Sequence, residues 1–247
     1  MIGSYTNGCI AGAQALPLKG RGWRVIRAHR NRNWGHPDLI AFVKRLGRFA
    51  AASFQRPILV ADIAQPRGGP ISGHASHEIG LDADIRLLLL RPEEISSTYL
   101  RTPPNVSMLN TGKGEINADR WSSRQLKLIR FAAQDPAVDR IFVNPVIKRA
   151  LCRSVTRDRR WLGKVVPWYG HDAHMHVRMS CPAGSPKCRP QKAIPPGDGC
   201  GKPLKWWFEV ALPSARAWLK RAKKKPAKRR YVAPPVLPAA CRAVLRK

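Results

Sequence analysis

The sequence predicts a single α+β domain with a central antiparallel sheet, flanking helices and long loops. Segments with helical periodicity and segments with strand character follow one another irregularly, without the steady strand–helix–strand rhythm of a doubly wound sheet. The chain has 247 residues, of which 44% are hydrophobic. That length fits one large domain or two small ones, and the hydrophobic content is sufficient for a well-packed core.

Local patterns place the elements in order. A proline and an aspartate suit the first turn of a helix that begins near Pro37 and continues with apolar residues at helical spacing to Phe49. Further helices are predicted at 121–133 and 145–151, and strands at 57–61, 85–90, 138–143 and 174–179. Residues 4–20 are turn-rich, 91–120 are polar and poorly patterned, and the chain becomes loop-rich from 182.

The C-terminal part differs in composition from the rest. Residues 216–230 contain nine basic residues and no acidic one, and three prolines follow before Cys241. We therefore predict a folded domain over 1–213 and a basic, proline-rich segment over 214–247. We expect this segment to be a mostly disordered connector that Cys241 pins back to the domain.

The overall charge suggests a polyanionic partner. Forty-five lysines and arginines against fifteen acidic residues give a net charge of +30, which favours nucleic acid, anionic lipid or an acidic cell-wall polymer. A solvated basic surface without a ligand is the alternative. No apolar run is long enough to span a bilayer, so we expect no transmembrane segment. The first residues show no secretory signal, so the protein is either cytosolic or exported by a signal that this sequence lacks.

The six cysteines favour an exported protein. They lie at Cys9, Cys152, Cys181, Cys188, Cys200 and Cys241. The absence of a C-x-x-C pair argues against a zinc finger or a thioredoxin-like motif. An even number of cysteines, spread between the two ends of the chain, suits three disulfides in an oxidising compartment, with fifteen possible pairings. Six buried thiols in a cytosolic enzyme are the alternative.

Two short stretches contain five of the seven histidines. The first is GHASHEIGLDAD at 73–84, and the second is GHDAHMHV at 170–177. His77 and Asp84 are seven residues apart, a spacing that suits one ligand on a turn or helix end and the other on the next strand, with Gly80 permitting the bend. His174 and His176 share one face of the predicted strand. Imidazole and carboxylate are zinc ligands, so the two stretches predict a hydrolytic zinc site.

Each stretch alone is a weak signal. A histidine and an aspartate seven residues apart occur by chance in many proteins, and a His-x-His pair can lie on an ordinary surface. Two histidines two residues apart do not always reach one ion, so one of them can ligate while the other acts on substrate. His29 and His36 lie outside both stretches, and His36, which precedes Pro37, suits a helix start better than a metal site.

The pattern H-x-x-G-x-x-x-D followed by H-x-H resembles the signature shared by lysostaphin-type peptidases, D-Ala-D-Ala metallopeptidases and hedgehog domains. More closely, the sequence is similar to the penicillin-insensitive murein endopeptidase family. The resemblance covers residues 4 to about 208, and it is carried by SYTNGC at 4–9, GHPDL at 35–39, GHASHEIGLDAD at 73–84, RIFVNP at 140–145, AHMHVRMSCP at 173–182 and GDGCG at 197–201. Collinear matches over this length are highly specific.

The resemblance implies a single disulfide-stapled zinc peptidase domain, located in the periplasm, that cuts D-alanyl–meso-diaminopimelate cross-bridges of peptidoglycan. By position, His77, Asp84 and His176 would bind the zinc. His174 would be the active-site base or transition-state donor, and His171 a second active-site imidazole. His74 matches a family histidine beside the metal, either as a further ligand or as a supporting group.

The resemblance also implies the disulfides Cys9–Cys241, Cys152–Cys200 and Cys181–Cys188. Three features depart from the family pattern: the sequence has no export signal, the basic run at 216–230 is denser, and residues 112–115 match poorly the loop that carries an accessory metal in some relatives. The partner implied is the cross-linked peptide of peptidoglycan. No nucleic acid is expected, and a homodimer is left open.

Two other classes of function compete with a zinc endopeptidase. The charge of +30 would suit a polyanion- or nucleic-acid-binding protein, but the basic run lies mainly outside the motifs and, with Trp218 as its single aromatic residue, lacks the repeated interleaved aromatics that base stacking uses. A catalytically inactive zinc fold used for binding is the other alternative, and the complete set of histidines argues against it. The sequence has no glutamate in a His-Glu-x-x-His arrangement, so the base would be an imidazole, with His174 the best candidate.

Overall fold

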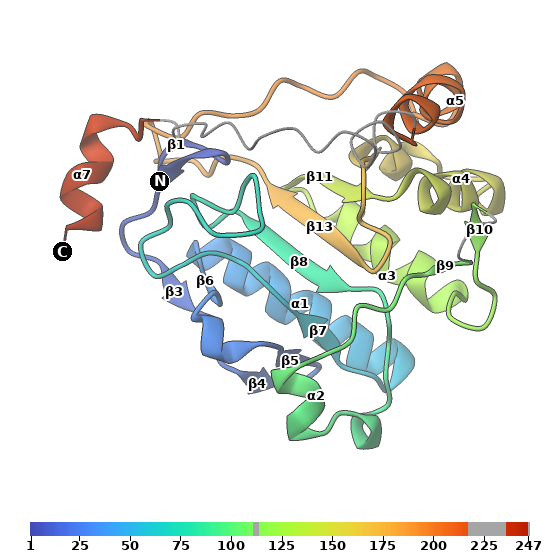
Figure 1. Cartoon of the computed structure of the whole chain (residues 1–247), viewed down its shortest axis with the longest axis horizontal. Helices are drawn as coiled ribbons and strands as arrows, with labels where there is room; N and C mark the ends of the chain where they lie inside the picture. Colours follow the sequence, from blue (N-terminus) through green and yellow to red (C-terminus); the bar gives the residue numbers. More distant parts are fainter. Residues whose placement is uncertain (111–113, 217–235, 247) are drawn as a thin grey trace, which may run out of the picture.

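The protein is built around a seven-stranded sheet, seen in the computed structural model, which describes residues 1–110, 114–216 and 236–246 (Figure 1). From one edge to the other the strands are β12 (Val165–Pro167), β11 (Val138–Val143), β13 (His174–Met179), β8 (Asp82–Arg86), β7 (Ile58–Val60), β5 (Trp23–Val25) and β4 (Lys19–Gly20). The four central strands pair antiparallel, whereas β12 runs parallel to β11 and β5 runs parallel to β7. The predicted α+β class and central antiparallel sheet are confirmed.

Helices α1 (Pro37–Phe54) and α3 (Ser123–Gln134) lie on one face of this sheet (Figure 1). His36 caps α1 by accepting a hydrogen bond from the backbone N–H of Asp38, as expected for a helix start. The apolar side of α1 is buried against β5 and β7, and the Phe49 ring stacks on Phe131 of α3 with centroids 4.1 Å apart. Each fully buried apolar side chain of α1, such as Leu39 or Phe42, contributes roughly 1.5–3 kcal/mol.

The remaining elements are short and lie around the sheet. The other helices are α2 (Ser97–Arg101), α4 (Pro145–Ser154), α5 (Lys202–Trp206), the π-helical turn η4 (Trp207–Ala211), α7 (Ala239–Leu245) and the 3-10 turns η1 (Ala28–Arg30), η2 (Pro92–Glu94) and η3 (Arg160–Lys164). Three two-stranded sheets pair β1 (Ile2–Ser4) with β2 (Asn7–Cys9), β3 (Gln14–Ala15) with β6 (Trp34–Gly35), and β9 (Leu109–Asn110) with β10 (Glu115–Ile116).

The structure differs from the sequence prediction in several segments. The strand predicted at 85–90 is wrong in its bounds, because β8 covers Asp82–Arg86 and the apolar residues after it leave the sheet. Leu87 and Leu89 lie in a loop but their side chains are buried, so their apolar character reflects burial and not strand pairing. Residues 4–20 are not all loop, since they contain β2, β3 and β4 and the last residue of β1, and the polar segment 91–120 contains α2, β9 and β10. Neither α5 nor η4 was predicted.

Three disulfides cross-link the fold, and their pairings are those that the resemblance implied. Cys9–Cys241, Cys152–Cys200 and Cys181–Cys188 have Cα–Cα distances of 5.7, 5.7 and 5.8 Å. The first joins α7 to β2, and Figure 1 shows α7 beside the N-terminal hairpin. All the cysteines of the chain lie within the described ranges, and none of them is free. Closing a loop as long as that of the first bridge constrains the unfolded chain more than a short bridge does.

The predicted boundary at 213/214 falls within helical backbone, which continues from α5 to Arg216. Most of the predicted basic connector, and part of the loop at 112–115 compared with the accessory metal loop, lie outside the described residues. The division into two segments therefore remains a prediction. Within the described ranges, no helix is both long enough and apolar enough to cross a membrane.

Candidate functional site

The candidate site lies on the face of β8 and β13 opposite to the helices. Alternate residues of each strand face opposite sides of the sheet, so Ala83, Ile85, Met175 and Val177 enter the hydrophobic core. The intervening residues form three cross-strand pairs on the other face: Asp84 opposite His176, Asp82 opposite Arg178, and Arg86 opposite His174. Polar side chains thus alternate with core residues on the two central strands.

His77 reaches this face from the loop before β8. Its backbone has φ +75°, in the left-handed region that a non-glycine residue seldom adopts. Its N–H donates to Asp82 Oδ2 at 3.0 Å, and its Nδ1 donates to the Ile63 carbonyl at 2.6 Å. Since a carbonyl oxygen only accepts, the proton lies on Nδ1 and the Nε2 lone pair points toward Asp84. Gly80, with φ +67°, makes the predicted bend between His77 and Asp84.

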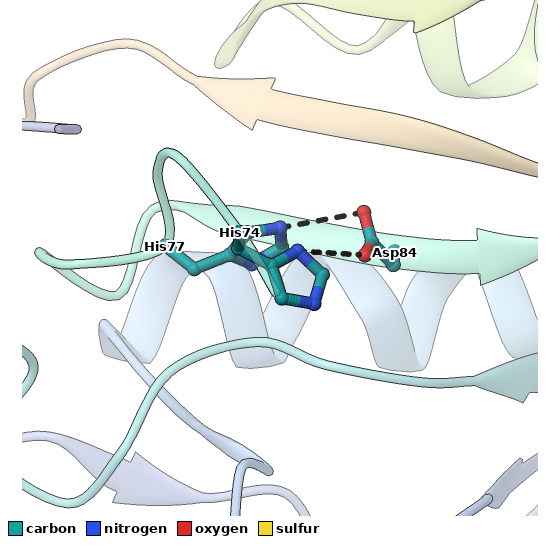
Figure 2. Close-up of side chains that lie close together, drawn as sticks. All are labelled: His74, His77 and Asp84. Atoms are coloured by element: carbon teal, nitrogen blue, oxygen red, sulfur yellow. Dashed lines mark ion pairs between the residues drawn. The ribbon is translucent and has the colours of Figure 1, made fainter. Parts of the chain in front are cut away.

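The Asp84 carboxylate is the centre of the cluster (Figure 2). Its Oδ1 lies 3.4 Å from His77 Nε2, 3.2 Å from His176 Nδ1 and 3.6 Å from His174 Nε2. Its Oδ2 lies 3.6 Å from His74 Nδ1. Although burial opposes ionisation, the imidazoles of His77 and His174 hold the pKa of Asp84 well below its usual range. The structure therefore brings every predicted ligand together around one carboxylate.

The donor set fits a metal ion. One ligand atom from each of His74, His77 and Asp84 lies within 4.8 Å of the others. His77 Nε2 and Asp84 Oδ1 are both buried, and neither has a hydrogen-bond partner among the described residues. Leaving such an atom unsatisfied costs roughly 1–3 kcal/mol. A cation held between the imidazole nitrogen and the carboxylate oxygen would satisfy both, and nitrogen with oxygen is a donor set that zinc accepts.

His176 is held between two carboxylates. Its Nε2 lies 3.0 Å from Asp82 Oδ1, while its Nδ1 faces Asp84. Burial disfavours the charged imidazole, but contacts with Asp82 and Asp84 raise the pKa of His176 to about 9. With this pKa the His176 ring carries a proton on both nitrogens at neutral pH, so a metal ion that binds Nδ1 must displace the proton there. His174 and His176 do point to the same face, as predicted from their spacing.

His171 and His174 occupy the more open side of the site. Their ring centroids are 5.1 Å apart. Burial and the neighbouring His174 lower the pKa of His171 to about 4, and burial also lowers the pKa of His174. His171 Nδ1 donates to the Tyr169 carbonyl at 2.7 Å. The neutral ring therefore offers Nε2 as a proton acceptor, which is the requirement for a general base.

A cavity of about 530 Å³ opens over these histidines. His74, His171, His174 and His176 line it together with Phe142, Trp168, Tyr169 and Arg178. Its volume lies in the range of small-molecule and peptide sites. Among the described residues, no aspartate or glutamate lines the cavity, so a substrate that carries carboxylates would meet no like charge on these walls.

Two aspartates that support the ligands were not predicted from the sequence. Asp82 is fully buried, accepts the His77 N–H, and pairs with Arg178, whose Nε lies 2.7 Å from Oδ1. Asp62 accepts from His74 Nε2 at 2.9 Å and also contacts Arg30 and Arg32. The alternation of Asp82 with Asp84 was a usable signal, because residues two apart on a strand share a face. For Asp62, the sequence offers only its place after a buried strand.

Comparison with known proteins agrees with this geometry. The model of the penicillin-insensitive murein endopeptidase family matches residues 1–246. The chain is 50% identical to a penicillin-insensitive murein endopeptidase of Haemophilus influenzae over 223 residues, which cover 86% of this chain and 74% of the relative. It is 43% and 44% identical to proteins of the same name from Klebsiella pneumoniae and Salmonella newport, over 99% of this chain and 85% of each relative. The matched span contains every residue of the cluster around Asp84, and the chain belongs to the penicillin-insensitive murein endopeptidase family.

Proposed function

We propose that this protein is a zinc-dependent D,D-endopeptidase that hydrolyses the D-alanyl–meso-diaminopimelate cross-bridges of peptidoglycan in the periplasm. The observation that carries the proposal is the pair of buried, unpartnered atoms, His77 Nε2 and Asp84 Oδ1, which face each other 3.4 Å apart below a cavity lined by imidazoles. Membership of the family supplies the substrate class. Three disulfides suit an oxidising compartment such as the periplasm.

His77, Asp84 and His176 would hold the zinc, with His74 as a further ligand or as a supporting group. Zinc bound there would supply Lewis acidity, which polarises a scissile carbonyl and lowers the pKa of a bound water toward about 7. Asp62 and Asp82 hold the imidazoles of His74 and His176 from behind. Such outer contacts fix the orientation of ligating imidazoles.

The bases in this scheme are the two imidazoles on the open side. His174, the nearer to Asp84, would take a proton from the attacking water and return it to the leaving amine. His171, which is neutral at neutral pH and anchored by the Tyr169 carbonyl, would accept a proton at Nε2 and so share the base role with His174. No cysteine nucleophile takes part, since every cysteine is in a disulfide, and the scheme needs no serine.

Digestion of purified peptidoglycan tests the proposal. The protein should convert cross-linked muropeptide dimers to monomers, and mass spectrometry should place the cut between D-alanine and meso-diaminopimelate. A chelator should abolish the reaction, and zinc should restore it. His29→Ala, which alters an exposed histidine that belongs neither to the cluster around Asp84 nor to the cavity lining, is the matched control and should cleave like the wild type. Undiminished cleavage by exhaustively chelated, metal-free protein would contradict the zinc requirement.

A further inference from the structure

Three exposed aromatic side chains and a fourth, buried one form a ledge that begins at the edge of the candidate active-site cavity. We call Trp168, Tyr169, Trp206 and Trp207 the aromatic shelf. Trp168, Tyr169 and Trp206 are 50%, 44% and 50% exposed, whereas Trp207 is 9% exposed and lies beneath them. Large apolar groups gathered on a surface mark a place where something binds.

The shelf is a rigid structure made by two separate segments. Trp168 and Tyr169 follow strand β12, and Trp206 and Trp207 lie at the junction of α5 and η4. Trp207 packs edge-to-face against all three others, with centroid distances of 4.9 Å to Tyr169, 5.6 Å to Trp206 and 6.2 Å to Trp168. The Tyr169 hydroxyl donates to the Ala211 carbonyl at 3.3 Å. Rings fixed in this way lose little conformational freedom when they bind a ligand.

The shelf leads away from the catalytic histidines. Phe142 lies between the two, with its ring 5.3 Å from that of His176 and 5.7 Å from that of Trp168. Trp168 and Tyr169 line the cavity, but Trp206 and Trp207 do not. Trp206 therefore stands outside the cavity, where it would contact a part of the substrate remote from the scissile bond.

We propose that the aromatic shelf binds the sugar rings of the glycan strand to which the cross-linked peptides are attached. This inference rests on the proposed function, because that function places the peptide cross-bridge in the cavity and the glycan beyond it. A pyranose ring has an apolar face of C–H groups and a rim of hydroxyls. The half-exposed indoles offer flat apolar faces, and the exposed ion pair of Lys205 and Glu209, 3.4 Å apart on the same helical segment, offers polar partners to the rim.

Two substrates separate sugar binding from peptide binding. One is a cross-linked muropeptide dimer that retains its sugars, and the other is the same dimer after amidase removal of the sugars. In the zinc-loaded full chain, Trp206→Leu should lower the ratio of kcat/KM for the sugar-bearing over the sugar-free substrate about tenfold, the scale of a lost aromatic contact. Trp206→Phe, which keeps an aromatic face, should retain most of that ratio.

Leu18→Ala is the matched control. Leu18 is 54% exposed and precedes β4, at the opposite edge of the sheet from β12, about 29 Å away if strands are 4.8 Å apart. It should leave the ratio unchanged. An equal loss on both substrates in Trp206→Leu would mean that the shelf contacts peptide, and an unchanged ratio would mean that it contacts nothing in this substrate. Either result would overturn the proposal.

A direct binding measurement separates this inference from the proposed function. Peptide-free glycan strands, titrated into the wild type, should quench tryptophan fluorescence, and Trp206→Leu should bind them about tenfold more weakly. If the wild type cleaves neither substrate, the proposed function fails, while this titration still decides whether the shelf binds sugar. Absence of any binding by the wild type would overturn the inference even if cleavage is observed.

Discussion

The two histidine-bearing stretches meet around Asp84, but they hold their side chains differently. In the first, the His77 side chain has no exposed surface, and its Nδ1 is hydrogen-bonded to the Ile63 carbonyl, away from Asp84. In the second, His171 and His174 border the open cavity, and their pKa values are lowered. The comparison separates two tasks: a ligand must be fixed and desolvated, whereas a base must be neutral and accessible to substrate.

His176 lies in the second stretch of the sequence, but its side chain is buried like that of His77 in the first. It is buried, it sits between Asp82 and Asp84, and its pKa is raised to about 9, in contrast to the lowered pKa values of its neighbours. Its position on β13 directly opposite Asp84 accounts for this, because cross-strand pairing places the two side chains together. The roles that we propose therefore follow strand register and burial, and not the order of the histidines along the chain.

The largest expected effect comes from removing a ligand. His77→Ala, Asp84→Ala and His176→Ala should each lose most of the bound zinc and more than about 10³-fold in turnover, since the ion supplies several kcal/mol of transition-state stabilisation. Metal analysis of the purified variants checks this, with His29→Ala as the control. One full equivalent of zinc in His176→Ala would contradict the assignment of His176 as a zinc ligand, and would place it with His171 and His174 instead.

The next largest effect separates bases from ligands. His174→Ala should retain zinc and the native melting temperature while turnover falls roughly 10²-fold or more, as expected for the loss of an acid–base group. His171→Ala should also retain zinc, with a smaller loss. Parallel measurement of zinc content and kcat makes the distinction. If His174→Ala emptied the site of metal, the assignment of His174 as a base would be wrong.

Asp82 links the two stretches, and its substitution tests how far the ligands depend on being fixed. Asp82→Asn should weaken zinc binding about 10- to 100-fold, the scale for an outer-shell group, because it loosens both the His77 backbone and the His176 ring. It also leaves Arg178 buried without its counter-charge, which costs roughly 3–5 kcal/mol.

The double variant Asp82→Asn/Arg178→Met removes both charges and serves as the control for folding. It should recover stability, as measured by denaturant unfolding, without recovering zinc affinity. Zinc affinity that returned with stability would show that Asp82 acts on the fold and not on the ligands.

Much of this site could be predicted from the sequence, and the remainder depends on contacts that the sequence does not encode locally. Strong periodicity located α1, α3 and β13. The spacing of His174 with His176 placed both on one face of a strand, and the spacing of His77 with Asp84 suited one residue before a strand and the other on it. Asp62 escaped prediction because its partner His74 is brought beside it only by the loop that leads into β8. The aromatic shelf escaped for the same reason, since Trp168 and Trp207 meet only in the folded protein.

The smallest expected effect concerns His74, which the geometry allows either to bind the ion or to hold Asp84 in place. Its Nδ1 is 3.6 Å from Asp84 Oδ2, while its Nε2 is hydrogen-bonded to Asp62. It is also more exposed than His77, with 22% of its side chain accessible against none for His77.

We expect His74→Ala to weaken zinc binding by only about tenfold, at the lower end of the outer-shell range, because the His74 imidazole is partly solvated and less firmly enclosed than that of His77. Asp62→Asn should weaken it less than His74→Ala does, because an amide oxygen still accepts a hydrogen bond from Nε2. Competition with a chelator of known affinity measures both variants on one scale. Loss of zinc from His74→Ala as complete as that from His77→Ala would make His74 a full ligand and extend the fixed group of imidazoles to include it.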